Sequence, residues 1–188
     1  MERDRASAGA PERPRSVLLL EDGPSDAGDR LCGELLAGEH PGETRLLLVT
    51  LVDTPATRLA AWDAVVDERP AEVVAVRMAV AGGDTTGEPE IDVHTISNPS
   101  NLTRFGVQIT EALAALDGDH PAVCFHSLSV LLQYVTVEQA FQFLSVLKSH
   151  LDTAEATAHF HLDPSTHDEQ TVATLCHLFD EVVRASEG

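Results

Sequence analysis

A short loop between an apolar run and a predicted helix has the glycine spacing of a phosphate-binding loop. Gly23 and Gly28 are five positions apart and follow the apolar residues 16–20, which matches the pattern G-x-x-x-x-G-K-[ST] in its strand-to-helix context. In that pattern the lysine neutralises phosphate charge and the hydroxyl group holds Mg²⁺. Here Asp29 stands at the lysine position and Arg30 at the hydroxyl position. A carboxylate at residue 29 repels a triphosphate, so the loop is either a degenerate nucleotide site or a plain strand–turn–helix connection.

A second set of residues capable of chemistry lies toward the C-terminus. His159 and His161 are two positions apart on a predicted strand and therefore point to the same face of a sheet. Asp163 and His167 follow them, and His126 ends another predicted strand. Histidine and carboxylate ligands suit zinc, which activates water when one coordination position stays open. The sequence around them carries no established metal-binding signature. We therefore favour buried, hydrogen-bonded histidines and a helix cap, and we expect no metal or other cofactor.

Acidic residues near the N-terminus permit a third interpretation. Residues 18–26 resemble the acidic start of two-component receiver domains, in which Glu21 and Asp22 would hold Mg²⁺ and Asp53 would accept a phosphoryl group. A receiver domain also needs a lysine at the end of a late strand. Lys148 is the only lysine of the chain and falls on a predicted helix. A receiver-like phosphoacceptor is therefore the less favoured alternative.

The elements that must position these residues alternate between strands and helices. Apolar runs predict buried strands, and apolar stripes at helical spacing predict the helices between them. The predicted strands cover residues 16–21, 44–52, 72–80, 91–96, 122–125 and 154–162, and the predicted helices begin near Ser25, Thr54, Ser100, Val137 and Thr166. The last helix opens with a capping box at Thr166 and Glu169 and is expected to reach Val182. This alternation predicts an α/β fold of three layers, a mostly parallel sheet with helices on both faces.

Two of the predicted strands resemble strands of RecA/KaiC-type P-loop ATPases. Residues 46–53, LLLVTLVD, are similar to the KaiC-type strand that ends in catalytic glutamates, and Asp53 is the one acid retained there. Residues 122–132, AVCFHSLSVLL, are similar to the Walker B strand, with His126 in place of the aspartate and Ser127 unchanged. The resemblance extends from residue 16 to about residue 183 and implies a RecA-like P-loop fold. An uncharacterised haloarchaeal family of this fold is similar as well.

The same resemblance implies that catalysis has been lost. The loop lysine, the loop hydroxyl, the Walker B aspartate and one of two catalytic glutamates are all replaced. Phosphoryl transfer depends on these groups together, so ATP hydrolysis is expected to be absent. RecA-like relatives assemble through subunit contacts, which implies self-association as a homo-oligomer.

The charge of the chain narrows the classes of partner. The 31 acidic residues exceed the 12 Lys and Arg residues and give a formal charge of −19. Such a balance is typical of adaptation to a salt-loaded cytoplasm, because molar salt screens charges beyond about 3 Å. Nucleic-acid binding relies on basic clusters, and the arginines after residue 15 are scattered. The apolar runs are too short to span a bilayer. We expect neither a nucleic-acid nor a membrane partner.

The organisation predicted from the sequence is simple. Residues 1–15 read as a disordered leader without the apolar block of a signal peptide, and residues 16–188 as a single domain. Cys32, Cys124 and Cys176 lack CxxC spacing, which indicates reduced intracellular thiols, two of them in the core, rather than a disulfide framework or zinc ribbon. The resulting hypothesis is a cytoplasmic, non-catalytic, RecA/KaiC-like regulatory or scaffold protein that acts through contacts with a protein partner. A metal-dependent enzyme or sensor using the histidines is the alternative.

Overall fold

The strands of this protein form one seven-stranded sheet in which all neighbouring pairs are parallel. The structure is a computed structural model that describes residues 16–23, 25–79, 91–116, 118–119 and 121–185. The expected leader over residues 1–15 lies outside these ranges. Within them, the strand order is β4-β3-β2-β5-β6-β1-β7.

The bounds of the elements follow the alternation seen in the sequence. The strands are β1 Ser16–Leu20, β2 Arg45–Thr50, β3 Glu72–Met78, β4 Asp92–Ile96, β5 Ala122–His126, β6 Thr157–Leu162 and β7 Glu181–Arg184. The α-helices are α1 Asp26–Ala37, α2 Pro55–Asp63, α3 Leu102–Ala115, α4 Leu128–Leu131, α5 Val137–Thr153 and α6 Glu169–Cys176. Short 3₁₀ turns lie at Pro41–Glu43 and Pro164–Thr166.

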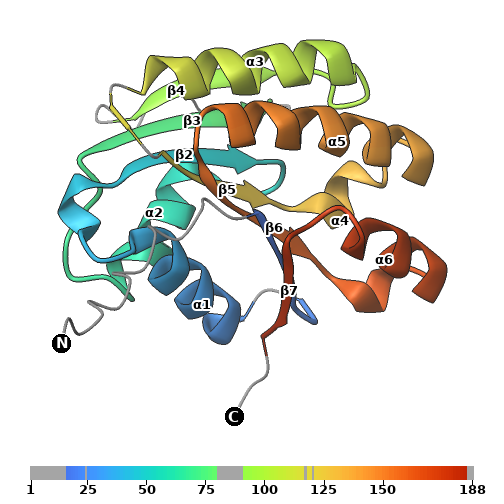
Figure 1. Ribbon diagram of the computed structural model, residues 1–188, viewed down its shortest axis with the longest axis horizontal. Helices are drawn as coiled ribbons and strands as arrows, with labels where there is room; N and C mark the ends of the chain where they lie inside the picture. The colour runs from blue at the N-terminus through green and yellow to red at the C-terminus, as the bar shows by residue number, and fades with distance from the viewer. Residues whose placement is uncertain (1–15, 24, 80–90, 117, 120, 186–188) are drawn as a thin grey trace, which may run out of the picture.

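Helices cover both faces of the sheet, as the three-layer prediction requires. Helices α1 and α2 lie on one face, and α3 and α5 lie side by side on the other, with α6 beyond them (Figure 1). All five residues of β1 and of β5 are buried, because central parallel strands have helices on both sides. The core under α3 and α5 contains a run of aromatic rings in which Phe125 stacks on Phe160 with centroids 5.5 Å apart.

The register brings four strand ends together at the carboxyl edge of the sheet. Strand β6 lies between β1 and β5, and β5 in turn pairs with β2. His161 is opposite Leu19 of β1, and His126 is opposite Thr50 of β2. Ligands of open parallel sheets bind at this edge, so the residues that end these four strands define the candidate site.

The C-terminal segment differs from the prediction. Helix α6 begins after its N-cap Asp168 rather than at a Thr166 capping box, and it ends at Cys176. Val182 belongs to β7, an exposed edge strand, and not to the last helix as expected. Phe179 and Val182 have the spacing of a helix, but they do not lie on one. Phe179 is apolar because it packs on the aromatic core, with its ring 4.9 Å from that of Phe160.

Two predicted starts also shift. The strand expected from residue 154 begins at Thr157, because Ala154 is the C-cap of α5 and Glu155 adopts a positive φ of 53°. Helix α3 is capped by Asn101, whose side chain accepts the Arg104 N–H, and not by Ser100. These are boundary errors of a few residues that leave the order of the elements unchanged.

Candidate functional site

A cleft of about 240 Å³ lies at the carboxyl edge, where β1, β6, β5 and β2 end. Its walls include Glu21, which follows β1, Asp53, which follows β2, and His126 and His161 from the ends of β5 and β6. Glu21, His126 and His161 are all less than 8% exposed. Buried ionisable groups that meet at this edge mark the place where the fold would bind a ligand.

The glycine loop at this cleft uses its backbone amides internally. Gly23 adopts a φ of 78°, a conformation that side chains disfavour, and its N–H donates to Oδ2 of Asp163 at 3.1 Å. Ser25 caps α1, and its hydroxyl accepts the N–H of Gly28 at 3.0 Å. In a phosphate-binding loop these amides would point at the ligand. Here a carboxylate and a hydroxyl group already occupy two of them.

Glu21 supplies an internal anion next to the same loop. A Cβ at Gly28 would collide with Oε2 of Glu21, so the carboxylate lies directly against the first turn of α1. Its other oxygen, Oε1, accepts a hydrogen bond from Nδ1 of His161 at 2.8 Å. The N-terminus of a helix attracts negative charge, and this position is taken by a side chain of the protein itself.

Asp29, at the lysine position of the loop, forms an ion pair across to α2. Its Oδ1 lies 2.5 Å from Nη2 of Arg58, and Nη1 of the same guanidinium lies 3.8 Å from Oδ2 of Asp53. The Arg58 side chain is 8% exposed, and the two carboxylates are each 31% exposed. Arg30, the other substituted loop position, is exposed to solvent. The single guanidinium of Arg58 therefore lies between the Asp29 and Asp53 carboxylates and offsets part of their charge.

The three histidines near the cleft differ in charge. Burial lowers the pKa of His126 to about 3, with further lowering by His161 and Arg58, and burial lowers the pKa of His159 to about 4. Burial also lowers the pKa of His161, but the Cys124 thiolate and the Glu21 carboxylate outweigh it and raise that pKa to about 9. At neutral pH His161 is therefore cationic, and the other two histidines, His126 and His159, are neutral.

Two buried cysteines contact the opposite side of the His161 ring. Nε2 of His161 lies 3.3 Å from Sγ of Cys32 and 3.6 Å from Sγ of Cys124, and the two sulfurs are 3.6 Å apart. The pKa of Cys124 is held well below its usual range by the hydrogen bond from the Cys32 thiol and by the charge of His161, against the effect of burial. The pKa of Cys32 is raised by the same hydrogen bond and by burial. Of the two thiols, that of Cys124 is therefore the more acidic, and it lies against the cationic His161 ring.

The structure brings together only part of the histidine set that the sequence suggested as metal ligands. The rings of His126 and His161 are 4.8 Å apart, as the adjacency of β5 and β6 predicts. His159 is on the same face but two residues deeper, opposite Cys124, and neither of its ring nitrogens has a hydrogen-bond partner among the described residues. Asp163 binds the glycine loop, and His167 follows the 3₁₀ turn outside the cluster.

Two serines, Ser127 and Ser129, follow β5. The peptide bond that joins the end of the strand to the first of them, His126–Ser127, is cis. Ser127 occupies the N-cap position of α4, but its side chain makes no capping hydrogen bond. Ser129 is buried and its hydroxyl accepts the N–H of Asp163 at 2.8 Å. Ser129 therefore has a structural role in joining α4 to the end of β6.

Cys32, Cys124 and Arg58 were not predicted as members of the site. Two of the three cysteines are buried in the core, as expected, but no pattern in the sequence predicts that Cys32 and His161 contact Cys124. These partners are 92 and 37 residues away along the chain. Only the packing of α1 on β5 and β6 brings them together, so no local spacing signals the cluster.

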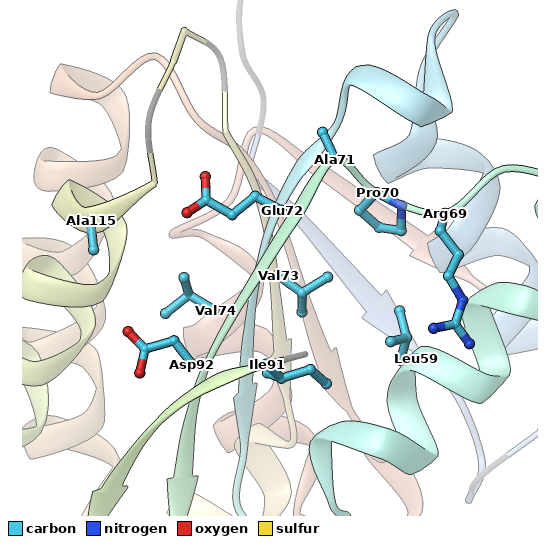
Figure 2. A pocket seen from close by; sticks show the side chains of 10 residues that line it. All are labelled: Leu59, Arg69, Pro70, Ala71, Glu72, Val73, Val74, Ile91, Asp92 and Ala115. Carbon is cyan, nitrogen blue, oxygen red and sulfur yellow. The ribbon is translucent and has the colours of Figure 1, made fainter. Parts of the chain in front are cut away.

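A second hollow, of about 400 Å³, lies at the opposite edge of the sheet. It surrounds the beginnings of β3 and β4, and Figure 2 shows Glu72 and Asp92 directed toward the side of Ala115 while Leu59 and Arg69 lie on the side of α2. Amino ends of parallel strands are not where such folds bind ligands. We therefore do not assign the functional site to this hollow.

None of the helices among the described residues is long and apolar enough to cross a membrane. The search of curated proteins found no match. Among solved structures, one from Pyrococcus horikoshii OT3, described as a structural study of Project ID PH0250, is similar with a TM-score of 0.62 at 11% sequence identity. That similarity covers 93% of this chain and 83% of the other, and it extends to the fold alone.

The α/β fold with its covered parallel sheet thus has a solved counterpart of similar extent. The family model described as "Family of unknown function (DUF7504)" matches residues 14–185, which is nearly the whole chain. The protein therefore belongs to this family of unknown function, DUF7504.

Proposed function

We propose that this protein is a RecA/KaiC-like regulatory or scaffold protein that does not hydrolyse ATP and acts through contacts with another protein. The observation that carries the proposal is the ion-pair network at the degenerate nucleotide site. Asp29 replaces the loop lysine, and the Arg58 guanidinium that could have offset this change is itself bound between Asp29 and Asp53. A triphosphate at this loop would meet carboxylates where it needs cations.

The local backbone supports the same proposal. The Gly23 and Gly28 amides donate to Asp163 and Ser25, and the Glu21 carboxylate lies against Gly28 at the helix N-terminus. The fold therefore satisfies, with its own acceptors, several of the groups by which a related loop would bind phosphate.

A direct binding experiment tests the loss of nucleotide chemistry. Calorimetry with ATP and Mg²⁺ at molar salt is expected to show no binding tighter than the millimolar range, and phosphate release is expected to stay at background. Micromolar binding would overturn the proposal. So would phosphate release that disappears in Asp53→Asn, because Asp53 is the one acid left at the catalytic position and loss in this variant excludes a contaminating ATPase.

The groove between α3 and α5 supports the part of the proposal that concerns protein contacts. It has a volume of about 750 Å³, and its lining includes the exposed Val107 and Val146 and the partly buried Phe143. The described residues that line it include no Asp, Glu, Lys or Arg, although the chain carries a formal charge of −19. An uncharged, partly apolar groove on an acidic protein suits an uncharged segment of a partner protein.

Matched aspartate substitutions test the groove. Val146→Asp places a charge in the groove, and Leu35→Asp places one at an exposed apolar site on α1, on the other face of the sheet. A partner recovered at high salt with the wild type and with Leu35→Asp, but not with Val146→Asp, supports the proposal. Equal recovery by all three proteins contradicts it. The RecA-like resemblance also implies self-association, and the recovered partner could then be a second copy of the chain. Sedimentation at molar salt distinguishes this case, because Val146→Asp would then convert the oligomer to a smaller species.

The receiver-like alternative finds less support in the geometry. Lys148, the only lysine, binds Asp180 at 3.0 Å, and Asp180 in turn binds Ser16 at the amino end of β1. This is the edge of the sheet opposite to Asp53, the residue that would accept the phosphoryl group.

A further inference from the structure

The two buried cysteines and His161 converge from three separate elements on one point beneath α1. Cys32 comes from α1, Cys124 from β5 and His161 from β6. Each of the three residues is less than 5% exposed, and each offers one ligand atom to a group whose atoms lie within 4.8 Å of one another. Thiolate and imidazole are the ligands that zinc prefers in proteins.

The spacing of the three atoms matches the edges of a zinc tetrahedron. Zinc binds thiolate sulfur at about 2.3 Å and imidazole nitrogen at about 2.0–2.1 Å, which places two sulfurs about 3.8 Å apart and sulfur and nitrogen about 3.5 Å apart. The observed separations are 3.6 Å between the sulfurs, and 3.3 and 3.6 Å from Nε2 of His161 to Cys32 and Cys124. A disulfide would need the sulfurs at about 2.05 Å, so the two sulfurs are spaced as ligands of one metal ion and not as a disulfide bond.

The orientation of His161 also fits a metal ligand. Its Nδ1 faces Oε1 of Glu21 at 2.8 Å, so the Nδ1 proton is held by a carboxylate and Nε2 is directed at the two sulfurs. Metal-binding histidines usually donate their second ring N–H to such a partner. This arrangement also excludes a separate site at Glu21, His126 and His161, because the Nδ1 that donates to Glu21 cannot bind a second ion.

The surroundings leave room for a fourth ligand of the size of a water molecule. A cavity of about 20 Å³ lies between α1, α2 and the sheet, and both cysteines, Asp29, Arg58 and Trp62 contribute to its walls. A cavity needs about 10–15 Å³ to hold one water, so this one admits a water and excludes a larger substrate. An ion here would tie α1 to β5 and β6 rather than process a ligand.

We propose that Cys32, Cys124 and His161 bind one Zn²⁺ ion, with Glu21 as the positioning residue of the histidine and a water molecule as the fourth ligand. Binding displaces the proton of the Cys32 thiol and the proton on Nε2 of His161, so both sulfurs bind as thiolates and their charge neutralises that of the ion. The site is independent of the proposed regulatory function, since a protein that binds nucleotide would retain it.

Metal analysis of the wild type and of matched variants tests the site. The protein is expressed without a histidine tag, purified at molar salt with a reductant and without chelators, and its zinc content is measured. We expect about one zinc per chain, the stoichiometry of a single site. Cys32→Ser and Cys124→Ser are expected to lose the zinc. Cys176→Ser is the control, because Cys176 is on α6 outside the cluster, and it is expected to keep it.

Cobalt substitution reports the ligand set directly through visible absorption, and this measurement does not depend on how stable a variant is. Co²⁺ added to chelator-treated wild type is expected to give thiolate-to-metal charge transfer and the strong visible bands of tetrahedral coordination. Glu21→Gln is expected to keep these bands while zinc affinity, measured by chelator competition, falls about 10- to 100-fold, the usual effect of removing a partner of a ligating histidine.

Three results would overturn the proposal. The first is wild-type protein that stays free of zinc under excess zinc while both buried thiols remain reduced. The second is zinc that persists in the Cys32→Ser, Cys124→Ser double variant. The third is a Cys32–Cys124 disulfide in protein isolated under reducing conditions.

Discussion

Replacing Gly28 with alanine tests whether the contact between Gly28 and the Glu21 carboxylate outweighs the helical propensity of residue 28 in α1. Gly28 lies in α1 and Gly106 in α3, and alanine is favoured over glycine in a helix by up to about 1 kcal/mol. A Cβ at Gly106 would make an ordinary contact at 3.5 Å with the Phe143 ring, whereas one at Gly28 would collide with the Glu21 carboxylate. Propensity alone predicts that both substitutions stabilise the protein, and packing predicts that they differ in sign.

The size of the difference follows from the hydrogen bond that Glu21 must give up. Its carboxylate is the end of a flexible side chain and can move away, but it then loses the 2.8 Å contact with Nδ1 of His161. A hydrogen bond to a charged group contributes about 1.5–3 kcal/mol. Gly28→Ala is therefore expected to lower the free energy of unfolding by about 0.5–2 kcal/mol after the gain in propensity. It should melt roughly 3–12 °C below Gly106→Ala, at about 2–4 °C per kcal/mol for a domain of this size.

Thermal and urea unfolding at molar salt with a chelator present would measure this difference without a contribution from bound metal. A double-mutant cycle with Glu21→Ala identifies the cause, because Gly28→Ala should cost nothing further once the carboxylate is gone. If Gly28→Ala is as stable as Gly106→Ala, or costs the same with and without Glu21, the close contact between the loop and the carboxylate does not exist as described.

Three further outcomes can be measured by urea unfolding. Arg58→Met should lower the free energy of unfolding by about 1–3 kcal/mol, because it leaves two half-buried carboxylates without their cation. Arg69→Met, the control at the exposed pair with Asp63, should lower it by less than about 1 kcal/mol. Equal losses would show that the internal ion pairs add nothing to stability. Burial raises the pKa of Asp180, but the Ser16 N–H and Lys148 outweigh it and lower that pKa. The Asp180 contribution is therefore present above the unfolded pKa of about 3.9 and is lost as the pH falls through the folded value. Asp180→Asn should accordingly destabilise the protein by less than about 1 kcal/mol at pH 7 and not at all below the folded pKa; a gap that persists there argues against the ion pair. Thr136→Ala removes the hydroxyl group that accepts the Gln139 N–H, while the backbone N–H of residue 136 stays bonded to Oε1 of Gln139. It should cost about 1 kcal/mol, and no change would mean that this hydroxyl cap adds nothing to the stability of α5.

Most of the fold could be predicted because its central strands are buried on both faces. β1, β2 and β5 read as uninterrupted apolar runs, the pattern of parallel strands covered by helices. β7 lacks that signal because it is an edge strand with mostly exposed residues, Glu-Val-Val-Arg. Its place in the sheet depends on the pairing with β1, which no local pattern encodes.

The candidate site was predictable only where it follows from strand ends. The loop at Gly23 and Gly28, Asp53, and the pairing of His126 with His161 all come from elements whose order a parallel sheet fixes. Arg58 and Cys32 were not predictable in this way, because they reach the site from the faces of α2 and α1. The rotation of a helix over a sheet depends on side-chain packing along its whole length, and this information is not local in the sequence.

The position of β1 in the sheet has a consequence for how the chain is made. Its two neighbours are β6 and β7, so β1 finds a partner only after β2 to β5 and the helices between them have been synthesised. Until then the apolar stretch Ser16–Leu20 keeps both of its hydrogen-bonding edges open, a state prone to aggregation and slow to resolve. The hydrogen bond from the Ser16 N–H to the Asp180 carboxylate then joins β1 to the residue that precedes β7.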